Sequence, residues 1–346
     1  MARVYPHMLA WREDPADPDR PLLSNPNVQR LAAHIAPGST ATDLGGVMSL
    51  NVGLHPAGLV LRVHQPFVSR PRLLAIQEVR RRLAGQGLAV PIPLPWRGKT
   101  VVRCGNRWAE LEAYLPNERP APTPEAYTWL FGAMGALDRA LAGLELPVPR
   151  PVYATYGPPS TLLRWLPVTE SAARGDPEAA GIARLLRELV RRLRTQWVPA
   201  TALPVQLVHG DVRLGNVCRT PEGKPLYLDF GFLARRPRVH ELAYAIAWMV
   251  LALDGHRAPE RFAWEHVARL IEEYETAAGT TLTAVEMQAL APYAAAVPLF
   301  QAAVAGFRDD AVEALRDGLR RPFMRVSEWL LAHPEALLGE QRSRAG

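Results

Sequence analysis

With 346 residues, of which 48% are apolar, the chain is long enough to form two lobes with substantial cores. Its two cysteines lie far apart and its longest apolar run, residues 243–253, is too short to cross a bilayer, so we expect a cytoplasmic protein with no disulfide framework and no membrane partner. The net charge of +6 comes from arginines spread over amphipathic stretches such as residues 182–197, without a basic–aromatic module, so we expect no nucleic-acid partner.

The first part of the chain is predicted to be an irregular arm followed by a helix and a hairpin. Residues 1–27 are rich in proline and charge and do not resemble a secretion signal, and residues 27–35 favour a short helix. Residues 42–66 have the pattern of two strands joined by a turn at residues 55–58. The glycine pair at residues 45–46 precedes the second half of the first strand, and such a pair is equally typical of a plain hairpin.

A change of composition marks the boundary between two predicted lobes. Residues 72–87 favour a helix and residues 100–116 favour two strands, after which proline-dense residues 117–124 lead into helical sequence. We therefore predict an α+β protein with a small β-rich lobe over residues 1–116 and a larger, mostly helical lobe over residues 117–346.

The second lobe is predicted to consist of helices around one irregular segment. Gly279 indicates a turn, and Thr283 with Glu286 has the spacing of a capping box at the start of a new helix. Helical periodicity covers residues 124–142, 177–197, 239–253, 259–278, 284–305 and 309–332.

The irregular segment carries three polar residues with the spacing of a phosphoryl-transfer site. Asp211 and Asn216 lie in HGDVRLGNV, residues 209–217, and Asp229 lies in LYLDFGF, residues 226–232. In such sites one Asp accepts the proton of the attacking hydroxyl, and an Asn and a second Asp hold the magnesium ions that bridge the nucleotide phosphates. Each residue alone is typical of a turn or a cap, whereas the joint pattern is specific.

Two neighbours of this motif have predicted roles. Arg213 could reach the γ-phosphate and neutralise the charge that develops on it, and the alternative is a surface arginine bound to a helix end or a carboxylate. His209 is predicted to pack behind the Asp229 loop rather than to transfer a proton.

The pattern HGDVRLGNV…LYLDFGFLARRPRVHELAYAI resembles the aminoglycoside phosphotransferase and choline kinase superfamily, small-molecule kinases that share the protein-kinase fold. The resemblance covers roughly residues 40–310 and implies a two-lobed fold with ATP and Mg²⁺ as cofactors. Glu241 fills a position where Asp is commoner, and we interpret it as a structural acid that ties the helix start to the loop.

The resemblance also implies where the nucleotide binds in the first lobe. Gly45, Gly46 and Ser49 occupy the stretch that matches the family's cover over the ATP phosphates, and backbone groups from Glu112 to Leu115 would meet the adenine.

The cation that anchors the nucleotide departs from the protein-kinase pattern. The chain has only two lysines, Lys99 and Lys224, and neither lies on the strand after the hairpin, where Arg62 takes the place of the usual lysine. The predicted partner of Arg62 is Glu78 on the next helix, and the alternative is an edge-strand surface arginine.

We therefore predict an ATP- and Mg²⁺-dependent phosphotransferase, a monomer or homodimer, with a small-molecule hydroxyl acceptor. The alternatives are a Ser/Thr protein kinase, a non-catalytic nucleotide-binding pseudokinase that serves as a scaffold, and a basic nucleic-acid binder; the intact motif argues against the pseudokinase, and the positive charge argues against a polycationic acceptor. Candidate acceptor residues, each with a core, turn or cap role as the alternative, are Tyr244, Trp248, Asp254, His256, Asp309 and Asp310.

Overall fold

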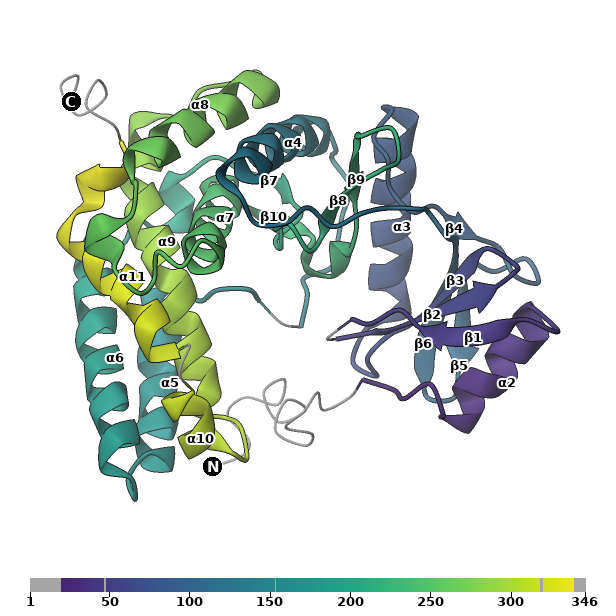
Figure 1. Cartoon of the computed structure of the whole chain (residues 1–346), viewed down its shortest axis with the longest axis horizontal. Helices are drawn as coiled ribbons and strands as arrows, with labels where there is room; N and C mark the ends of the chain where they lie inside the picture. The colour runs from purple at the N-terminus through teal and green to yellow at the C-terminus, as the bar shows by residue number, and fades with distance from the viewer. Residues whose placement is uncertain (1–19, 47, 153, 318–319, 339–346) are drawn as a thin grey trace. The chain divides into compact units, whose positions relative to one another are not determined.

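The structure is a computed structural model that describes residues 20–46, 48–152, 154–317 and 320–338 (Figure 1). Its architecture is α+β, as predicted, and it divides into two compact units. Two segments after residue 118 return to unit 1, whereas the prediction assigns every residue after 116 to the second lobe. Unit 1 holds the described residues of the ranges 1–118, 144–152 and 218–228, and unit 2 holds those of the ranges 119–143, 153–217 and 229–346.

Unit 1 is built around one antiparallel sheet with the order β1-β2-β3-β6-β4, in which β5 also pairs with β6. Side chains alternate between the two faces of a strand. Ala109 belongs to the apolar cluster with helix α2 (Pro26–Ile35), and the adjacent Glu110 contacts Arg80 of helix α3 (Arg70–Gly85), so the two helices cover opposite faces. The strands are β1 (Thr40–Asp43), β2 (Leu50–His55), β3 (Leu59–Val63), β4 (Pro93–Leu94), β5 (Val101–Cys104) and β6 (Arg107–Ala113).

The first predicted strand is in fact two strands, β1 and β2, separated by a glycine turn. Gly45 and Gly46 have φ angles of 89° and 113°, in the region that favours glycine. A Cβ atom on Gly46 would lie 2.5 Å from the carbonyl oxygen of Ser49, so the turn also needs glycine for space. The predicted turn between the next two strands, at residues 55–58, is confirmed.

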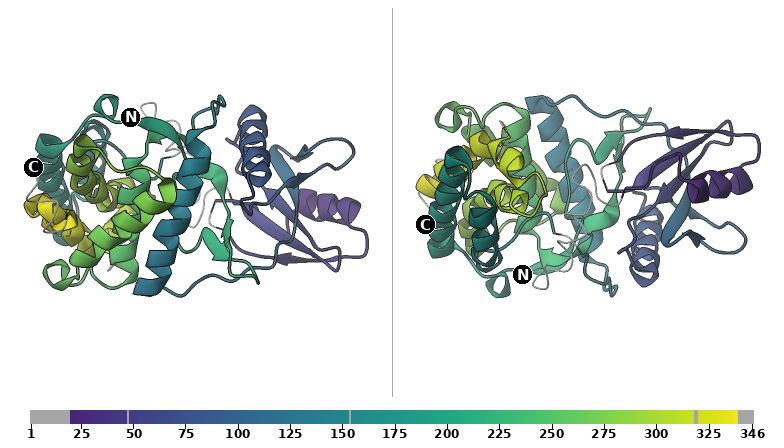
Figure 2. Two further views of the ribbon diagram at one scale, coloured as in Figure 1. Left: turned by 90° about the horizontal axis from the view of Figure 1, so that it is seen from above. Right: turned by 90° about the horizontal axis from the view of Figure 1, so that it is seen from below.

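Unit 2 is mostly helical, with the long apolar helix α9 packed against α5, α6, α7 and α11. Helices α4 and α8 run side by side (Figure 1, Figure 2). Among the described residues, α9 is the one helix with the length and composition to cross a membrane, but 83% of its apolar window is buried inside the protein. The helices are α4 (Pro124–Ala142), α5 (Pro159–Ala172), α6 (Pro177–Gln196), α7 (Val239–Ala252), α8 (Glu265–Ala278), α9 (Ala284–Ala305), α10 (Ala311–Arg316) and α11 (Arg320–Ala332).

Short elements complete the chain trace. Strands β7 and β10 pair antiparallel within unit 2, and β8 with β9 forms a separate two-stranded sheet. Their bounds are β7 (Val205–Val208), β8 (Val217–Arg219), β9 (Pro225–Tyr227) and β10 (Ala234–Pro237), and the 3₁₀ turns are η2 (Ala200–Ala202), η3 (Phe230–Phe232), η4 (Pro259–Arg261) and η5 (Pro334–Leu337).

Most predicted helices of unit 2 are confirmed, including the capping box of Thr283 and Glu286 at the start of α9. Two were too long. The helix predicted over residues 259–278 is η4 followed by α8, and the one predicted over 309–332 is interrupted after α10, where Asp317 has a non-helical conformation. Helix α5 was not predicted, because its proline-rich start and the internal Pro167 are poor helix signals.

Candidate active site

Asp211 lies in the loop between β7 and β8, and the backbone of this loop needs glycine immediately before it. Gly210 has a φ angle of 84°, and a Cβ atom there would lie 2.7 Å from the carbonyl oxygen of Phe232. Any larger residue would strain the backbone and push the two segments apart. The HGD tripeptide therefore reflects close packing of the loop as well as chemistry.

The Asp211 carboxylate is held on both of its oxygens. Its Oδ1 accepts a hydrogen bond of 2.5 Å from the hydroxyl of Tyr244, and the Nε atom of Arg213 lies 3.1 Å away. Its Oδ2 accepts a hydrogen bond of 2.7 Å from Nδ2 of Asn216. Because the side chain is only 4% exposed, these contacts fix the carboxylate in one orientation.

The surroundings of Asp211 also shift its acidity. Burial is the largest effect and raises the pKa of Asp211 to about 6. Arg213, Tyr244 and Asn216 act to lower this pKa, and repulsion from Asp229 acts to raise it. The carboxylates of Asp211 and Asp229 are thus close enough to interact, and a base that titrates near pH 6 is ionised at neutral pH.

Asp229 follows β9 in a left-handed backbone conformation, with a φ angle of 54°. Its side chain accepts a hydrogen bond of 3.3 Å from the backbone N–H of Gly231, which supports this conformation in a residue other than glycine. The ring centroid of His209 lies 4.7 Å from that of Phe230, so the predicted packing of His209 behind the Asp229 loop is confirmed.

Asn216 is oriented so that its amide oxygen is available. Its Nδ2 donates to the backbone oxygen and to Oδ2 of Asp211, at 2.9 and 2.7 Å, which leaves Oδ1 as the atom suited to a metal ion. Oxygen atoms of an amide and of the Asp229 carboxylate fit a hard cation such as Mg²⁺. Within the described ranges no group of three or more His, Cys, Asp and Glu residues could hold a metal.

Glu241 anchors the loop that carries Asp211, as predicted from the sequence. It is fully buried in the first turn of α7, and its two carboxylate oxygens lie 3.0 and 2.9 Å from the backbone nitrogen of Gly210.

Arg213 contacts the carboxylate of Asp211, and its guanidinium lies 5.8 Å from the ring centroid of Trp248. A role of Arg213 toward phosphate remains a prediction.

The predicted phosphate-binding residues of unit 1 lie in the turn between β1 and β2. Asn51 donates to the carbonyl oxygen of Gly45 at 2.9 Å, and Arg20 donates to that of Gly46 at 2.6 Å. Ser49 ends the turn and is buried. These bonds define the shape of the turn, and its contact with phosphate remains a prediction.

Arg62 lies on β3, which is flanked by β2 and β6, so the alternative of an edge-strand position is wrong. The predicted pair with Glu78 is also wrong. Glu78 is on the exposed side of α3, where its carboxylate pairs with Arg82 at 2.8 Å and Arg81 at 3.1 Å. The helical turn of about 100° per residue places Gln77 and Arg80, rather than Glu78, on the face toward the sheet.

A buried ionic network on that face of α3 was not predicted from the sequence. Arg80 pairs with Glu110 at 2.5 Å and with Glu112, and Glu110 also accepts hydrogen bonds from His64 at 2.9 Å and Gln77 at 2.8 Å. In the sequence, Leu73, Ile76 and Leu83 mark the apolar face of this helix. Gln77 and Arg80 share the helical spacing of that face, which was the available signal.

The segment predicted to meet the adenine is the end of β6 and the residues after it. The side chain of Glu112 belongs to the network with Arg80, and the carbonyl oxygen of Leu115 accepts a hydrogen bond of 2.7 Å from Nδ2 of Asn117. Backbone contact with adenine from Glu112 to Leu115 remains a prediction.

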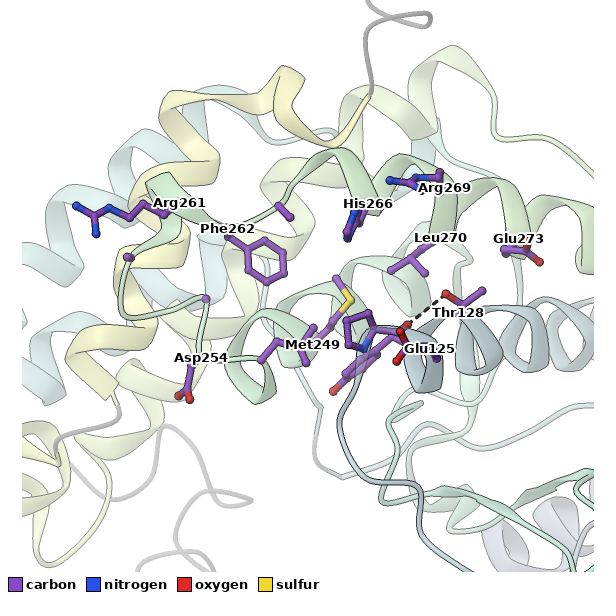
Figure 3. Close-up of a pocket in the computed structure, with 16 residues that line it drawn as sticks. Glu125, Thr128, Met249, Asp254, Arg261, Phe262, His266, Arg269, Leu270 and Glu273 are labelled. Atoms are coloured by element: carbon purple, nitrogen blue, oxygen red, sulfur yellow. Dashed lines mark hydrogen bonds between the residues drawn. The ribbon is translucent and has the colours of Figure 1, made fainter.

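The candidate acceptor residues do not form one cluster. Tyr244 contacts Asp211, and Trp248 lies one turn further along α7. Asp254 instead lines a cavity of about 760 Å³ with residues of α4, α7 and α8, where Met249, Phe262 and Leu270 provide apolar lining (Figure 3). Asp310 occupies the N-cap position of α10, as in the alternative, but its side chain pairs with Arg308 and makes no capping hydrogen bond. His256 is buried.

The sequence profile of the phosphotransferase enzyme family matches residues 50–293, well over half of the chain. Solved structures share the fold at low sequence identity. The microcompartment-associated aminopropanol kinase is 16% identical, with a TM-score of 0.69 over 90% of this chain and 98% of that chain. A spectinomycin phosphotransferase solved with ADP and spectinomycin is 15% identical, with a TM-score of 0.58 over 89% and 98%. The Plasmodium vivax ethanolamine kinase is 13% identical, with a TM-score of 0.55 over 90% and 85%.

Proposed function

Because the chain belongs to the phosphotransferase enzyme family, we propose that it transfers the γ-phosphate of ATP, with Mg²⁺, to a hydroxyl group of a small molecule. The observation that carries this proposal is the buried Asp211 carboxylate, held by Tyr244 and Asn216 and close enough to Asp229 to interact with it. This arrangement has the base and the two oxygen ligands that phosphoryl transfer to a hydroxyl requires.

In the proposed reaction Asp211 orients the acceptor hydroxyl and receives its proton. The acceptor oxygen forms a bond to the γ-phosphorus while the bond from that phosphorus to the bridging oxygen of ADP breaks. Arg213, which already contacts Asp211, would neutralise charge on the transferred group. Since the pKa of Asp211 is about 6, the carboxylate is ionised and able to take the proton at neutral pH.

Asn216 and Asp229 would hold Mg²⁺, which would supply positive charge to neutralise the phosphate groups. In unit 1 we assign the turn of Gly45, Gly46 and Ser49, together with Arg62, to the phosphates. This assignment follows the family resemblance and the glycine geometry of the turn. With only two cysteines in the chain, we also propose a cytoplasmic location.

Amino alcohols are the acceptors that we would test first. Two of the similar folds are an aminopropanol kinase and an ethanolamine kinase, and the third is a phosphotransferase of the antibiotic spectinomycin. The net charge of +6 disfavours acceptors that carry several positive charges, so a compact acceptor with one amine is the simpler match.

The substitution Asp211→Asn tests the proposal. We expect kcat to fall by about 10²- to 10⁴-fold, because the proton acceptor is lost while the shape is kept. The affinity for Mg²⁺–ATP should stay within about twofold, since nothing in the proposed nucleotide contacts changes. ADP production with a panel of amino alcohols, sugars and spectinomycin measures the rate, and equilibrium titration measures the affinity.

Asp317→Asn is the matched control. This carboxylate pairs with Arg320 at the protein surface, and we expect its loss to leave kcat unchanged. A near wild-type kcat in Asp211→Asn would remove Asp211 from the mechanism.

A further inference from the structure

Three successive turns of α7 contact the catalytic loop at residues 210–213. Glu241, Tyr244 and Trp248 are three and four residues apart, which places them on one face of the helix. Glu241 accepts from the backbone of residue 210, Tyr244 donates to the side chain of residue 211, and the Trp248 ring faces the guanidinium of residue 213. Neighbouring loop residues are thus held by neighbouring turns of one buried helix.

Tyr244 is the member of this set that contacts the proposed base. Its O–H donates to Oδ1 of Asp211 at 2.5 Å, within the range of short, charge-assisted hydrogen bonds. The other two side chains that contact the carboxylate, those of Asn216 and Arg213, belong to the same loop as Asp211, so of these three Tyr244 is the one that ties the carboxylate to a helix.

The tyrosine ring is itself held in place. It is 4% exposed, and its centroid lies 6.0 Å from that of Trp248, in an edge-on arrangement. The Trp248 ring in turn lies 5.7 Å from that of Phe323 on α11. A hydroxyl on a ring with a fixed position can fix the orientation of the carboxylate that accepts its hydrogen bond. A donor on a mobile side chain would move with the carboxylate instead.

We infer that Tyr244 is a positioning residue for phosphoryl transfer, and this inference rests on the proposed function. Its hydroxyl holds the Asp211 carboxylate so that a remaining lone pair points to the acceptor hydroxyl. Tyr244 itself neither gives nor takes the transferred proton. Since transfer depends on the alignment of the reacting groups, loss of the hydroxyl should reduce the rate of the chemical step and leave substrate binding unchanged.

Tyr244→Phe removes the hydroxyl and keeps the ring. With Mg²⁺–ATP and ethanolamine or 1-amino-2-propanol as acceptor, and with water as acceptor in slow ATP hydrolysis, we expect kcat to fall by about 10- to 100-fold. The KM for ATP should stay within twofold. Tyr293→Phe is the control, because the Tyr293 hydroxyl is also buried and donates to the carbonyl oxygen of Val198 at 3.2 Å, away from Asp211. That control should keep the wild-type kcat.

The double variant with Asp211→Asn separates positioning from general destabilisation. If Tyr244 acts through Asp211, adding Tyr244→Phe to Asp211→Asn should cause no further fall in kcat. An unchanged kcat in Tyr244→Phe, or losses that multiply in the double variant, would overturn the inference while leaving the proposed function in place.

Failure of the proposed function gives a different result. A wild type that transfers phosphate to neither water nor any acceptor, or an Asp211→Asn variant at full rate, overturns the function and the positioning role together. A non-additive effect of the two substitutions on the free energy of unfolding would then assign the Tyr244–Asp211 bond to folding alone.

Discussion

Single residues of the catalytic loop are chosen by backbone geometry as much as by chemistry. Gly210 is the residue that permits a positive φ and the approach of Phe232, and the left-handed conformation of Asp229 is supported by its own bond to Gly231. Repulsion from Asp229 helps to raise the pKa of Asp211, although burial is the largest cause.

Glu241 should be as important to the loop as the proposed catalytic residues. Its carboxylate accepts hydrogen bonds from the backbone of Gly210 and Val212, so Glu241→Ala leaves buried N–H groups without an acceptor. We expect the free energy of unfolding to fall by about 1–3 kcal/mol and kcat to fall with it. Urea unfolding and steady-state kinetics measure the two effects.

A first-turn glutamate on the surface is the control for this prediction. Glu265 opens α8 as Glu241 opens α7, but it is exposed, and Glu265→Ala should change the unfolding free energy by less than about 0.5 kcal/mol. Equal losses in the two variants would show that Glu241 does not anchor the loop.

Among the secondary-structure elements, helix α3 is held against the sheet by buried ion pairs between Arg80 and the glutamates of β6. Burial by itself opposes ionisation of Glu110, but Arg80 and His64 hold the pKa of Glu110 well below its usual value. The cation comes from the helix and the anions come from β6, the reverse of the predicted pair of Arg62 with Glu78.

Arg80→Met should therefore destabilise the protein strongly. It leaves Glu110 and Glu112 buried without their cation, and we expect a loss of about 3–5 kcal/mol in the free energy of unfolding. Arg81→Met is the neighbouring control, since the Arg81 side chain is 42% exposed and its pair with Glu78 should contribute less than about 1 kcal/mol. Similar denaturation midpoints for both variants would contradict a structural role for the network.

The contact between α4 and α8 depends on one glycine. A Cβ atom on Gly135 would lie 2.3 Å from the carbonyl oxygen of Tyr274 and 2.9 Å from Cβ of Ala277. Gly135→Ala should lower the free energy of unfolding by about 1–3 kcal/mol, because the helices must separate. Gly132→Ala, one turn earlier on α4 with no atom within 4 Å, should instead stabilise the helix by up to about 1 kcal/mol. Thermal unfolding distinguishes a lowered Tm from a raised one. A raised Tm in both variants would refute close packing at Gly135.

At the scale of the whole molecule, the proposed functional residues are divided between the two units. The turn at Gly45 and Gly46 and the strand residue Arg62 belong to unit 1, whereas Asp211, Asn216 and Asp229 belong to unit 2. The proposed function thus assigns the phosphate contacts and the chemistry to separately packed parts of one chain.

Binding of Mg²⁺–ATP should stabilise the folded protein by mass action. At a free nucleotide concentration of one hundred times Kd, we expect a gain of about 2.7 kcal/mol, visible as a higher Tm. Chelation of the metal with EDTA, or Asp229→Ala, should remove most of the shift, and Asp317→Asn should retain it. A shift that survives both chelation and Asp229→Ala would contradict the proposed metal site.

Features that depend on residues near one another in the chain could be predicted from the sequence. Periodicity of 3.6 residues identified α4 and α9, with a capping box for α9, and the spacing of Asp211, Asn216 and Asp229 predicts the chemistry of the site. The role of Glu241 also followed from its position in the motif, and its bonds to Gly210 confirm it.

The contacts between residues far apart in the chain could not be predicted, because they form only when the chain is folded. The bond of Tyr244 to Asp211 joins residues 33 positions apart, and that of Arg80 to Glu110 joins residues 30 apart. Which side chains meet in this way depends on the rotation of a helix about its axis and on the register of a strand, and packing sets both. For this reason the sequence pointed to Glu78 as the charged partner on α3, while the folded helix presents Arg80 to the sheet.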